Sequence, residues 1–292
     1  MHTVGLVLHP RRDSAEAVDA VMGWAARRQI AVVGIEAEIS RLNCAAAVPV
    51  TPEELGRRCD LLVSLGGDGT MLRAMRLADG QRAPVLGVNL GKLGFLAEVD
   101  VPSLPGALSA IDTKQFVIEP RLAIDGMIGG HAITAFNDVA VVRVPGHGSA
   151  IVAVHVAGEP FVSYAADAIV VATPTGSTAY SFSAGGPIVS PEVEALLVTP
   201  AAPHSAYNRG VVISARESVL LEILPGSGQL PVEVDGVVAG YAGPGERIGL
   251  RARPAAARVV RLGATTFYQR ARRKLRLTDS AEIPACWPDR GP

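Results

Sequence analysis

Through the first hundred residues, short apolar runs typical of buried strands alternate with segments whose apolar residues recur at helical spacing. Asp13–Arg28 has such a helical stripe, and Asp13 and Glu16 have the spacing of a capping box. A second, short helix is predicted from Thr70 to about Leu77. This alternation predicts a mainly parallel, doubly wound α/β sheet of the Rossmann-like type. The predicted strands are Val4–Leu8, Ala31–Ile35, Leu61–Leu65 and Pro84–Val88.

After about Pro120 the pattern changes to short alternating segments separated by turns such as Asp235-Gly236. This pattern is typical of an antiparallel, β-rich, sandwich-like domain with few helices. A length of 292 residues suits two domains. We therefore predict one domain over residues 1–118 and a second over 119–267. The alternating segments are Ala132–Val144, Ala150–Val156, Val219–Leu224, Pro231–Val238 and Arg258–Leu262.

The composition excludes several classes of protein. Hydrophobic residues make up 49% of the chain and charged residues 19%, which is incompatible with intrinsic disorder. The net charge of −1 supplies no whole-molecule field for nucleic acid or an anionic membrane, so neither is expected as a partner. The three cysteines, Cys44, Cys59 and Cys286, are too scattered for a disulfide framework or a CxxC zinc site, which suits a reducing cytoplasm.

Two segments bear on where the protein works. Met1–Arg12 carries its positive charge after its apolar run, which is the reverse of a secretory signal, so a cytoplasmic protein is expected. Ala168–Pro191 has no formal charge over 24 residues, a length that could span a bilayer. It also contains seven Ser or Thr residues, three Gly and three Pro, and this composition predicts a loop-rich site instead of a membrane span.

The first candidate site is the run Gly66-Gly67-Asp68-Gly69-Thr70, between a predicted strand and a predicted helix. This position is the carboxyl edge of the sheet, where open α/β folds bind ligands. The two adjacent glycines, Gly66 and Gly67, let the backbone approach a phosphate chain, and the helix N-terminus after Gly69 offers unpaired amides to an anion. Asp68 places a carboxylate in this loop, and phosphate repels a carboxylate unless the carboxylate binds a metal or accepts a proton from an attacking hydroxyl. Phosphoryl transfer needs this combination of a phosphate-binding loop and a carboxylate.

A purely structural alternative is a tight turn in which Asp68 caps the next helix. The usual nucleotide motifs are missing from the sequence. Gly87–Leu93 has one residue too few between its glycines for a P-loop and lacks the Ser or Thr that binds magnesium, and no G-x-G-x-x-G run follows a strand. Nucleotide binding would therefore use another design.

Asn137 and Asp138 stand in the middle of the apolar segment Ala132–Val144, where polar side chains are costly if buried without partners. Neighbouring strand residues point to opposite faces, so the pair can face one site only at a bulge or a strand end. A hairpin turn on the surface is the alternative.

The longest candidate is Asp167–Pro187, where a β-branched strand runs into a loop with six Ser or Thr residues between Thr173 and Ser183. Its hydroxyl and amide donors, beside the ring of Tyr180, suit a nucleoside through hydrogen bonds to base and ribose and through stacking. A flexible linker is the alternative, and the positions of Pro and Tyr argue against it.

Near the end of the chain, Arg270–Arg276 carries five basic residues in seven. A charge run of this kind usually forms the solvated face of a helix. A phosphate-facing patch is the alternative.

Together, five motifs in this order resemble the NAD kinase family. The Gly-Gly-Asp-Gly loop alone also resembles that of lipid kinases and phosphofructokinases, from which the Thr-Pro-Thr-Gly-Ser-Thr-Ala-Tyr run separates the chain. The five motifs are Gly66–Arg73, Gly87–Ala97, Asn137-Asp138, Thr173–Tyr180 and Thr199–Ser205.

The resemblance implies both a fold and a reaction. An α/β N-terminal domain and a β-rich C-terminal domain would bind NAD between them, and residues 268–292 would pack back on the N-terminal domain. A terminal phosphoryl group would pass from ATP, or from polyphosphate, to the 2′-hydroxyl of the adenosine ribose of NAD, which gives NADP. The family also implies a divalent metal such as Mg²⁺ and a homodimer or homotetramer.

The resemblance further implies roles for individual residues. Asp68 is expected to act as the general base, Gly67 and Gly69 to shape the phosphate loop, and Arg73 to neutralise the donor unless it is only a helix-surface residue. In the family an Asn-Glu/Asp pair holds ribose and adenine, and a later aspartate contacts the nicotinamide end. The residues expected to bind the dinucleotide are Phe95, Asn137, Asp138, Asp167, Thr178, Ala179, Tyr180 and Ser183. No residue is assigned as a metal ligand.

The sequence departs from the family pattern near these residues. Ala165 and Ala168 stand where many members have Arg two residues before the pocket aspartate and Gly just after it, and Asp138 is one methylene shorter than the commoner Glu. These departures leave open a second function, a dinucleotide-binding sensor with feeble phosphoryl transfer. A third, a lipid or sugar kinase that shares only the Gly-Gly-Asp-Gly loop, is opposed by the Thr173–Tyr180 run.

Overall fold

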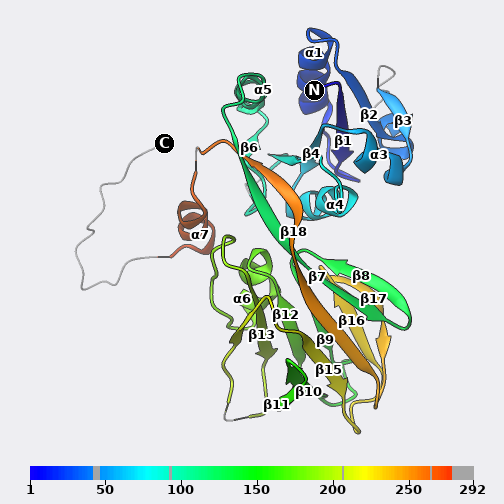
Figure 1. Cartoon of the computed structure of the whole chain (residues 1–292), viewed down its shortest axis with the longest axis vertical. Coiled ribbons are helices and arrows are strands. Elements are labelled where there is room, and N and C mark those ends of the chain that lie inside the picture. Colours follow the sequence, from blue (N-terminus) through cyan, green and yellow to red (C-terminus); the bar gives the residue numbers. More distant parts are fainter. Residues whose placement is uncertain (42–46, 92–93, 206, 264, 278–292) are drawn as a thin grey trace, which may run out of the picture.

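The chain folds into a helix-containing α/β part and a part made almost entirely of strands, as Figure 1 shows. The computed structural model describes residues 1–41, 47–91, 94–205, 207–263 and 265–277. Two long strands, β7 (Val117–Ile128) and β18 (Arg247–Arg261), pair with each other and run through both parts. Because these strands belong to both parts, the domain boundaries stay a prediction.

The α/β part is built on parallel strands in the order β3-β2-β1-β4-β5, and β18 pairs parallel with β5. Apolar side chains of α1 and α5 pack on one face of the sheet and those of α3 and α4 on the other. The predicted doubly wound α/β fold is therefore confirmed. The elements are β1 (Thr3–Leu8), α1 (Ala15–Ala26), β2 (Ala31–Ile35), α2 (Glu36–Arg41), β3 (Val48–Val50), α3 (Pro52–Arg58), β4 (Leu61–Gly66), α4 (Asp68–Leu77), β5 (Val85–Asn89), β6 (Val99–Asp100) and α5 (Leu104–Asp112).

The local sequence signals match this part closely, with one error. The four predicted strands coincide with β1, β2, β4 and β5 to within one residue at each end. The predicted capping box of Asp13 and Glu16 is wrong, because the helix is preceded by Ser14 and no side chain caps it. Asp13 Oδ1 instead accepts the N–H of Ala15 at 2.9 Å, which closes a local turn.

The β-rich part is a sandwich. Its second sheet has the order β14-β13-β12-β9-β16-β17, and one shared core lies between this sheet and strands β7, β10, β11, β15 and β18 of the first. The sandwich-like domain predicted from the alternating segments is therefore confirmed. The remaining strands are β8 (His131–Ala135), β9 (Asp138–Val142), β10 (Ala150–Val156), β11 (Glu159–Ala166), β12 (Ala168–Ala172), β13 (Ala195–Ala201), β14 (Val211–Ser214), β15 (Val219–Ile223), β16 (Leu230–Val234) and β17 (Val237–Ala242).

Two predicted strands are each divided in two. Ala132–Val144 breaks at Phe136 and Asn137, so β8 joins one sheet and β9 the other. Pro231–Val238 folds instead as the β16–β17 hairpin, with φ of 49° at Asp235 and 78° at Gly236. Asp-Gly favours this type of hairpin turn because both positions need positive φ.

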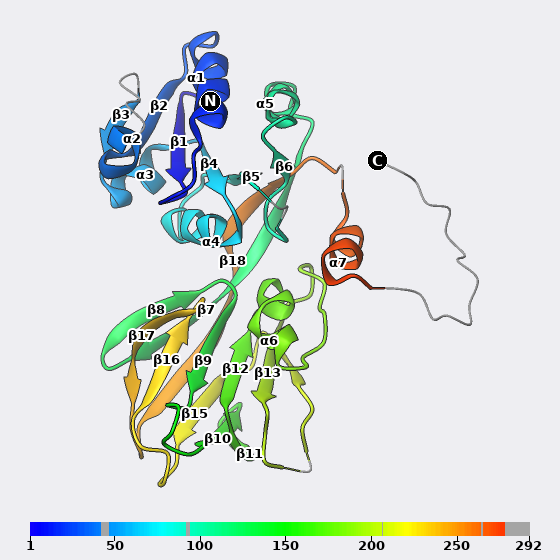
Figure 2. The same cartoon turned by 180° about the vertical axis from the view of Figure 1, so that it is seen from behind.

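Three short helices complete the fold. The turn η1 (Thr175–Thr178) and α6 (Tyr180–Ser183) lie at the ends of β12 and β13, on the side that faces the α/β part (Figure 2). In α7 (Phe267–Leu275), Arg270 is buried and donates to the Ala97 carbonyl and to Glu98. The solvated-face prediction is therefore wrong for Arg270, and residues 278–292 lie outside the described part of the chain. No helix within the described ranges is long and apolar enough to cross a membrane.

Candidate functional site

The glycine-rich run leads from buried β4 into α4, at the carboxyl edge of the parallel sheet. Gly67 is the N-cap, and Asp68 is the first residue of the helix. The half-buried Asp68 carboxylate accepts the backbone N–H of Phe95 and of Leu96, each at 3.0 Å. Asp68 therefore does not cap its own helix, and the simple turn alternative is wrong. Two donors fix the direction of its carboxylate.

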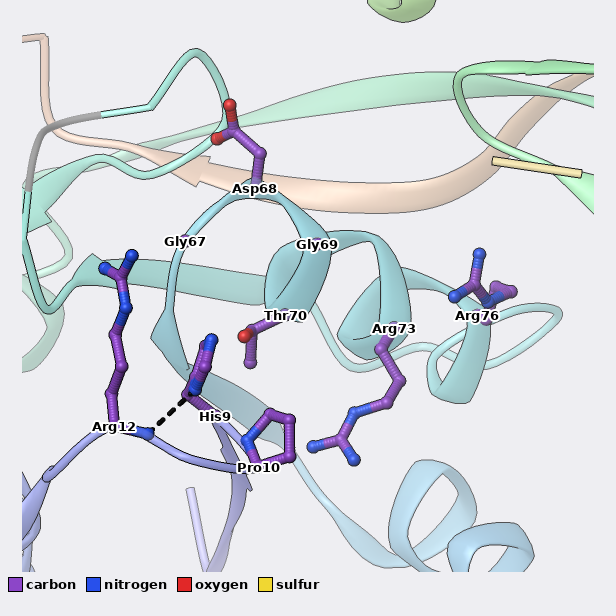
Figure 3. Close-up of a pocket in the computed structure, with 9 residues that line it drawn as sticks. All are labelled: His9, Pro10, Arg12, Gly67, Asp68, Gly69, Thr70, Arg73 and Arg76. Carbon is purple, nitrogen blue, oxygen red and sulfur yellow. Dashed lines mark hydrogen bonds between the residues drawn. The ribbon is translucent and has the colours of Figure 1, made fainter. Parts of the chain in front are cut away.

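A cavity of about 440 Å³ borders this run. Its lining includes three arginines and a histidine, and its one acidic residue, Asp68, turns the carboxylate away from them (Figure 3), which gives the cavity a positive character suited to a polyphosphate. A Cβ placed on Gly67 or Gly69 would meet no atom within 4 Å, so both backbones border open space. The lining residues are His9, Pro10, Arg12, Gly67, Asp68, Gly69, Thr70, Arg73 and Arg76 (Figure 3).

His9 and Arg12 were missed by the sequence analysis. They follow β1, and the end of this parallel strand meets the same sheet edge as the end of β4. His9 Nδ1 accepts the N–H groups of Arg11 at 3.1 Å and Arg12 at 2.9 Å, which leaves Nε2 as the ring donor. Burial and the neighbouring arginines lower the pKa of His9. The run of basic residues directly after the first predicted strand was the available signal.

Arg73 and Arg76 line the cavity, yet both guanidinium groups already have protein partners. Arg73 Nη1 lies 2.5 Å from Glu38 Oε1, and Arg73 Nη2 donates to the Leu8 carbonyl at 2.8 Å. Arg76 Nη1 lies 2.6 Å from Asp235 Oδ2. Figure 3 shows the Arg73 guanidinium turned toward Pro10 and the Asp68 carboxylate pointing the opposite way, out of the cavity. Arg73 is thus neither a simple surface residue nor a fully free cation.

The chain changes direction at Asn137 and Asp138, where the break between β8 and β9 lies. Asn137 lies in the bend, where its N–H donates to Asp235 Oδ1 at 2.7 Å and its carbonyl accepts the Thr173 N–H at 2.8 Å. Asp138 begins β9 and is only 4% exposed, so a surface hairpin is excluded for it. The pair therefore lies at a strand end, and that its two side chains face one site stays a prediction.

Asp138 lies among other acidic groups and against the Tyr180 segment. Burial, followed by the charges of Asp235 and Glu233, raises the pKa of Asp138 to about 7, and a hydrogen bond from the Tyr180 backbone opposes this. Burial, followed by the charges of Glu233, Asp167 and Asp138, likewise raises the pKa of Tyr180. The structure therefore brings Asp138, Asp167 and Tyr180 into one neighbourhood, and it adds Glu233, which the sequence analysis did not single out.

The Ser/Thr-rich loop uses much of its hydrogen-bonding capacity internally. Thr173 Oγ1 donates to the Phe136 carbonyl at 2.6 Å, and Ser177 Oγ donates to the Pro174 carbonyl at 2.7 Å. Both side chains are fully buried, so these two hydroxyls are not among the donors that the loop can offer to a ligand. The linker alternative is wrong as well. Of the expected pocket residues here, Thr178, Ala179 and Tyr180 are half-buried and Ser183 is exposed.

The two alanine departures do not leave Asp167 without a cation. Arg143, just after β9, places its Nε 2.5 Å from Asp167 Oδ1 and so supplies a guanidinium that Ala165 cannot. The sequence offered no signal for this pair, which lies 24 positions apart in the chain. Ala168 is fully buried in an apolar cluster with Ala140 and Val170. Its methyl group therefore packs in the core.

No three His, Cys, Asp or Glu side chains of the described residues gather within metal-binding range. The side chains of the described residues therefore do not form a metal site on their own. Asp68 could contribute one carboxylate to an ion held mainly by a phosphate ligand, which is how Mg²⁺ is often bound.

Comparison with known proteins identifies two family models along the chain. The ATP-NAD kinase N-terminal domain matches residues 4–116, and the ATP-NAD kinase C-terminal domain matches residues 136–262. Among similar curated proteins, NAD kinase 1 of Streptomyces avermitilis is 38% identical, over 95% of this chain and 88% of its own length. NAD kinase of Desulforamulus reducens is 37% identical, over 94% and 98%.

Solved structures show the same fold. Yeast NADH kinase complexed with NADH superposes with a TM-score of 0.84 at 23% identity, over 97% of this chain and 90% of that one. An NAD kinase from Archaeoglobus fulgidus in complex with ATP gives a TM-score of 0.73 at 23% identity, over 94% of this chain and 98% of that one.

Proposed function

The chain belongs to the NAD kinase family, and on this premise we propose that it transfers the terminal phosphoryl group of ATP to the 2′-hydroxyl of the adenosine ribose of NAD, giving NADP. The observation that carries the proposal is the Asp68 carboxylate, held by two backbone amides at the rim of an arginine-lined cavity. A carboxylate among glycines beside cationic side chains is what phosphoryl transfer to an alcohol requires.

The donor lies in the cavity between β1 and α4. Arg12 neutralises its phosphates, since no partner on the protein competes for that guanidinium among the hydrogen bonds and ion pairs of the described residues. His9 Nε2 and the open backbones of Gly67 and Gly69 supply further donors. Arg73 and Arg76 add partial positive charge, because each is already paired with a carboxylate.

Asp68 acts as the general base. As the 2′-hydroxyl oxygen attacks the terminal phosphorus, its proton passes to Asp68, the bond to the bridging oxygen breaks, and ADP leaves. The N–H groups of Phe95 and Leu96 occupy one side of the carboxylate and hold it in place. Holding a base in one orientation reduces the entropy lost on reaching the transition state.

The acceptor lies against the neighbourhood of Asp138, Asp167 and Tyr180. Carboxylates accept hydrogen bonds from ribose hydroxyls, and the Tyr180 ring offers a face for stacking. Asn137, Phe95, Thr178, Ala179 and Ser183 complete the proposed pocket. Mg²⁺ would be held mainly by the donor's phosphates, with Asp68 as the carboxylate able to contribute a ligand, and it would offset phosphate charge. The homodimer or homotetramer and the cytoplasmic location stay predictions.

The sensor alternative is weakened by one observation. Its motive was the departures at Ala165 and Ala168, and Arg143 supplies Asp167 with a guanidinium while the Ala168 methyl group packs in the core. The lipid or sugar kinase alternative is opposed by the family membership.

The proposal is tested by incubating the purified full-length chain with Mg²⁺ and a grid of donors and acceptors. The donors are ATP and polyphosphate, and the acceptors are NAD, NADH, diacylglycerol and fructose 6-phosphate. Formation of NADP from NAD and ATP supports the proposal. Phosphorylation of diacylglycerol or the sugar alone, or dinucleotide binding without any product, would contradict it.

A further inference from the structure

Asp235, at the tip of the β16–β17 hairpin, makes side-chain contacts that the hairpin turn itself does not require. The turn needs a residue that tolerates positive φ before Gly236, and Asn would serve as well as Asp. The Asp235 side chain is nevertheless only 1% exposed, and it faces the protein. A charged group buried this far needs partners, and its partners indicate its role.

The Asp235 carboxylate accepts three consecutive backbone N–H groups. Oδ1 takes those of Phe136 at 3.1 Å, Asn137 at 2.7 Å and Asp138 at 3.3 Å. The Asp235 N–H in turn donates to the Asp138 carbonyl at 2.9 Å. The backbone of the bend between β8 and β9 is therefore held by hydrogen bonds to this one side chain.

The same carboxylate also bonds to the helix that begins with Asp68. Its Oδ2 lies 2.6 Å from Arg76 Nη1, in the last turn of α4. An α-helix rises about 1.5 Å per residue and is stiff over this length, so fixing Arg76 fixes Asp68 at the other end. Asp235 thus joins the element that carries the proposed base to the segment that faces the proposed acceptor.

We propose that Asp235 is a positioning residue for phosphoryl transfer: it fixes the position of the Asn137-Asp138 segment relative to the helix that begins with Asp68. The inference rests on the proposed function for its kinetic consequence. Asp235 touches no reacting atom, and it acts through three backbone amides and one guanidinium. Misplacement of reacting groups by about 1 Å is enough to cost roughly 10²-fold in rate.

A second ion-pair network provides a matched control for a contact whose role is only structural. Arg253 in β18 makes a bidentate contact with Asp79, at 2.6 and 2.8 Å, and also binds Asp125 in β7. This network likewise joins the end of α4 to the long strands, but its hydrogen bonds do not reach residues 136–138. Asp79→Asn therefore weakens a comparable tie and leaves the bend intact.

The test compares Asp235→Asn with Asp79→Asn in the full chain. Asn keeps the turn, removes the charge and puts an NH2 donor in place of one of the two carboxylate acceptors, so it cannot hold both the bend and Arg76. We expect Asp235→Asn to lower kcat/KM for NAD by about 10-fold to 100-fold while KM for ATP changes less than about 3-fold. Asp79→Asn should leave kcat/KM for NAD within about 2-fold. Hydrogen exchange read by mass spectrometry should show faster exchange of the peptide containing residues 136–138 in Asp235→Asn alone.

Equal kcat/KM values for NAD in the two variants would overturn the proposal and leave Asp235 with a structural role only. If Asp235→Asn does not fold, Arg76→Met tests the tie from the helix side by hydrogen exchange, because Arg76 also lines the donor cavity and its kinetics would mix two effects. Faster exchange of the peptide containing residues 136–138 than in wild type is expected. Unchanged exchange would overturn the proposal. A wild-type chain that makes no NADP contradicts the proposed function, while the exchange of residues 136–138 still tests the positional role.

Discussion

Arg73 Nη1 in α4 lies 2.5 Å from Glu38 Oε1 in α2, and the same carboxylate accepts the Leu8 N–H at 2.7 Å through its other oxygen. Glu38 is 8% exposed, so it holds the end of β1 and the first turns of α4 from inside the protein. The pair shapes the wall of the donor cavity, and it also limits how much positive charge Arg73 offers to a phosphate.

Removal of the Glu38 charge should therefore destabilise the fold without weakening the donor site. Glu38→Gln is expected to lower the free energy of unfolding by about 1–3 kcal/mol, because a buried charged hydrogen bond is lost. KM for ATP should stay equal or fall, since Arg73 gains free charge. Urea unfolding and steady-state kinetics measure both, with the exposed Glu36→Gln as control. A rise in KM for ATP would contradict this account.

Asp68→Asn should keep the fold and most NAD binding, because the amide oxygen still accepts one of the two backbone N–H groups. Turnover should fall by about 10²-fold or more, the usual scale for loss of a general base. Calorimetric titration with NAD and initial rates of NADP formation give the two quantities, and Asp79→Asn, two residues past the end of the same helix, serves as reference. Unchanged turnover would remove Asp68 from the mechanism.

Arg12 is expected to govern donor affinity. Arg12→Gln should raise KM for ATP by about 10-fold, because one charge-assisted hydrogen bond to phosphate is lost. The neighbouring Arg11 does not line the cavity, so Arg11→Gln should leave KM for ATP nearly unchanged. Kinetics at two salt concentrations separate direct contact from general charge, since screening weakens only the latter strongly. Equal effects of the two substitutions would reject a direct contact.

Stability should depend on pH through Asp138. Its pKa is raised from 3.8 to about 7 in the folded protein, so the folded state binds more protons than the unfolded state between these values. This group's contribution is most favourable below about pH 4 and is lost as pH rises through 7. Asp138→Asn should therefore be more stable than wild type at pH 8, by at most about 4 kcal/mol, and similar near pH 4. Urea unfolding across that range checks it, and a constant difference would refute it.

Glu98 should be the most sensitive carboxylate of the α/β part. Its side chain is 1% exposed, and it accepts hydrogen bonds from Arg261 at 2.9 Å, Arg270 at 3.0 Å and the Leu262 N–H at 2.8 Å. Glu98→Gln leaves buried arginines short of negative charge, which typically costs about 3–5 kcal/mol. Thermal unfolding should show a clear loss, with exposed Glu16→Gln near wild type. A small effect would mean that the arginines find other partners.

Local signals in the sequence were reliable where the structure depends on neighbours in the chain. The strands of the parallel sheet follow apolar runs because burial on both faces demands them, and Gly67 and Gly69 border open space at a strand end as the Gly-Gly-Asp-Gly run predicted. The predicted capping box of Asp13 failed because a local turn competed for the same carboxylate.

The local pattern left a bulge, a strand end and a surface hairpin open at Asn137-Asp138 and could not choose between them. Alternation continues through Ala132–Val144, and the partner of the break is Asp235, 97 to 99 positions away, which accepts the backbone N–H groups there. Which hydroxyls of the loop stay available could not be predicted for a related reason, since Thr173 and Ser177 donate to carbonyls buried by packing.

The sequence alone determined the central strands of the parallel sheet, the Asp235-Gly236 turn and the family, because hydrophobic period, turn preference and motif spacing are properties of adjacent residues. Only the tertiary structure decided which partner each charge meets. Asp68 bonds to residues 27 and 28 positions away, Arg76 to one 159 away and Arg270 to one 172 away. Such pairs form because sheet topology brings distant segments together and burial penalises any charge left without a partner.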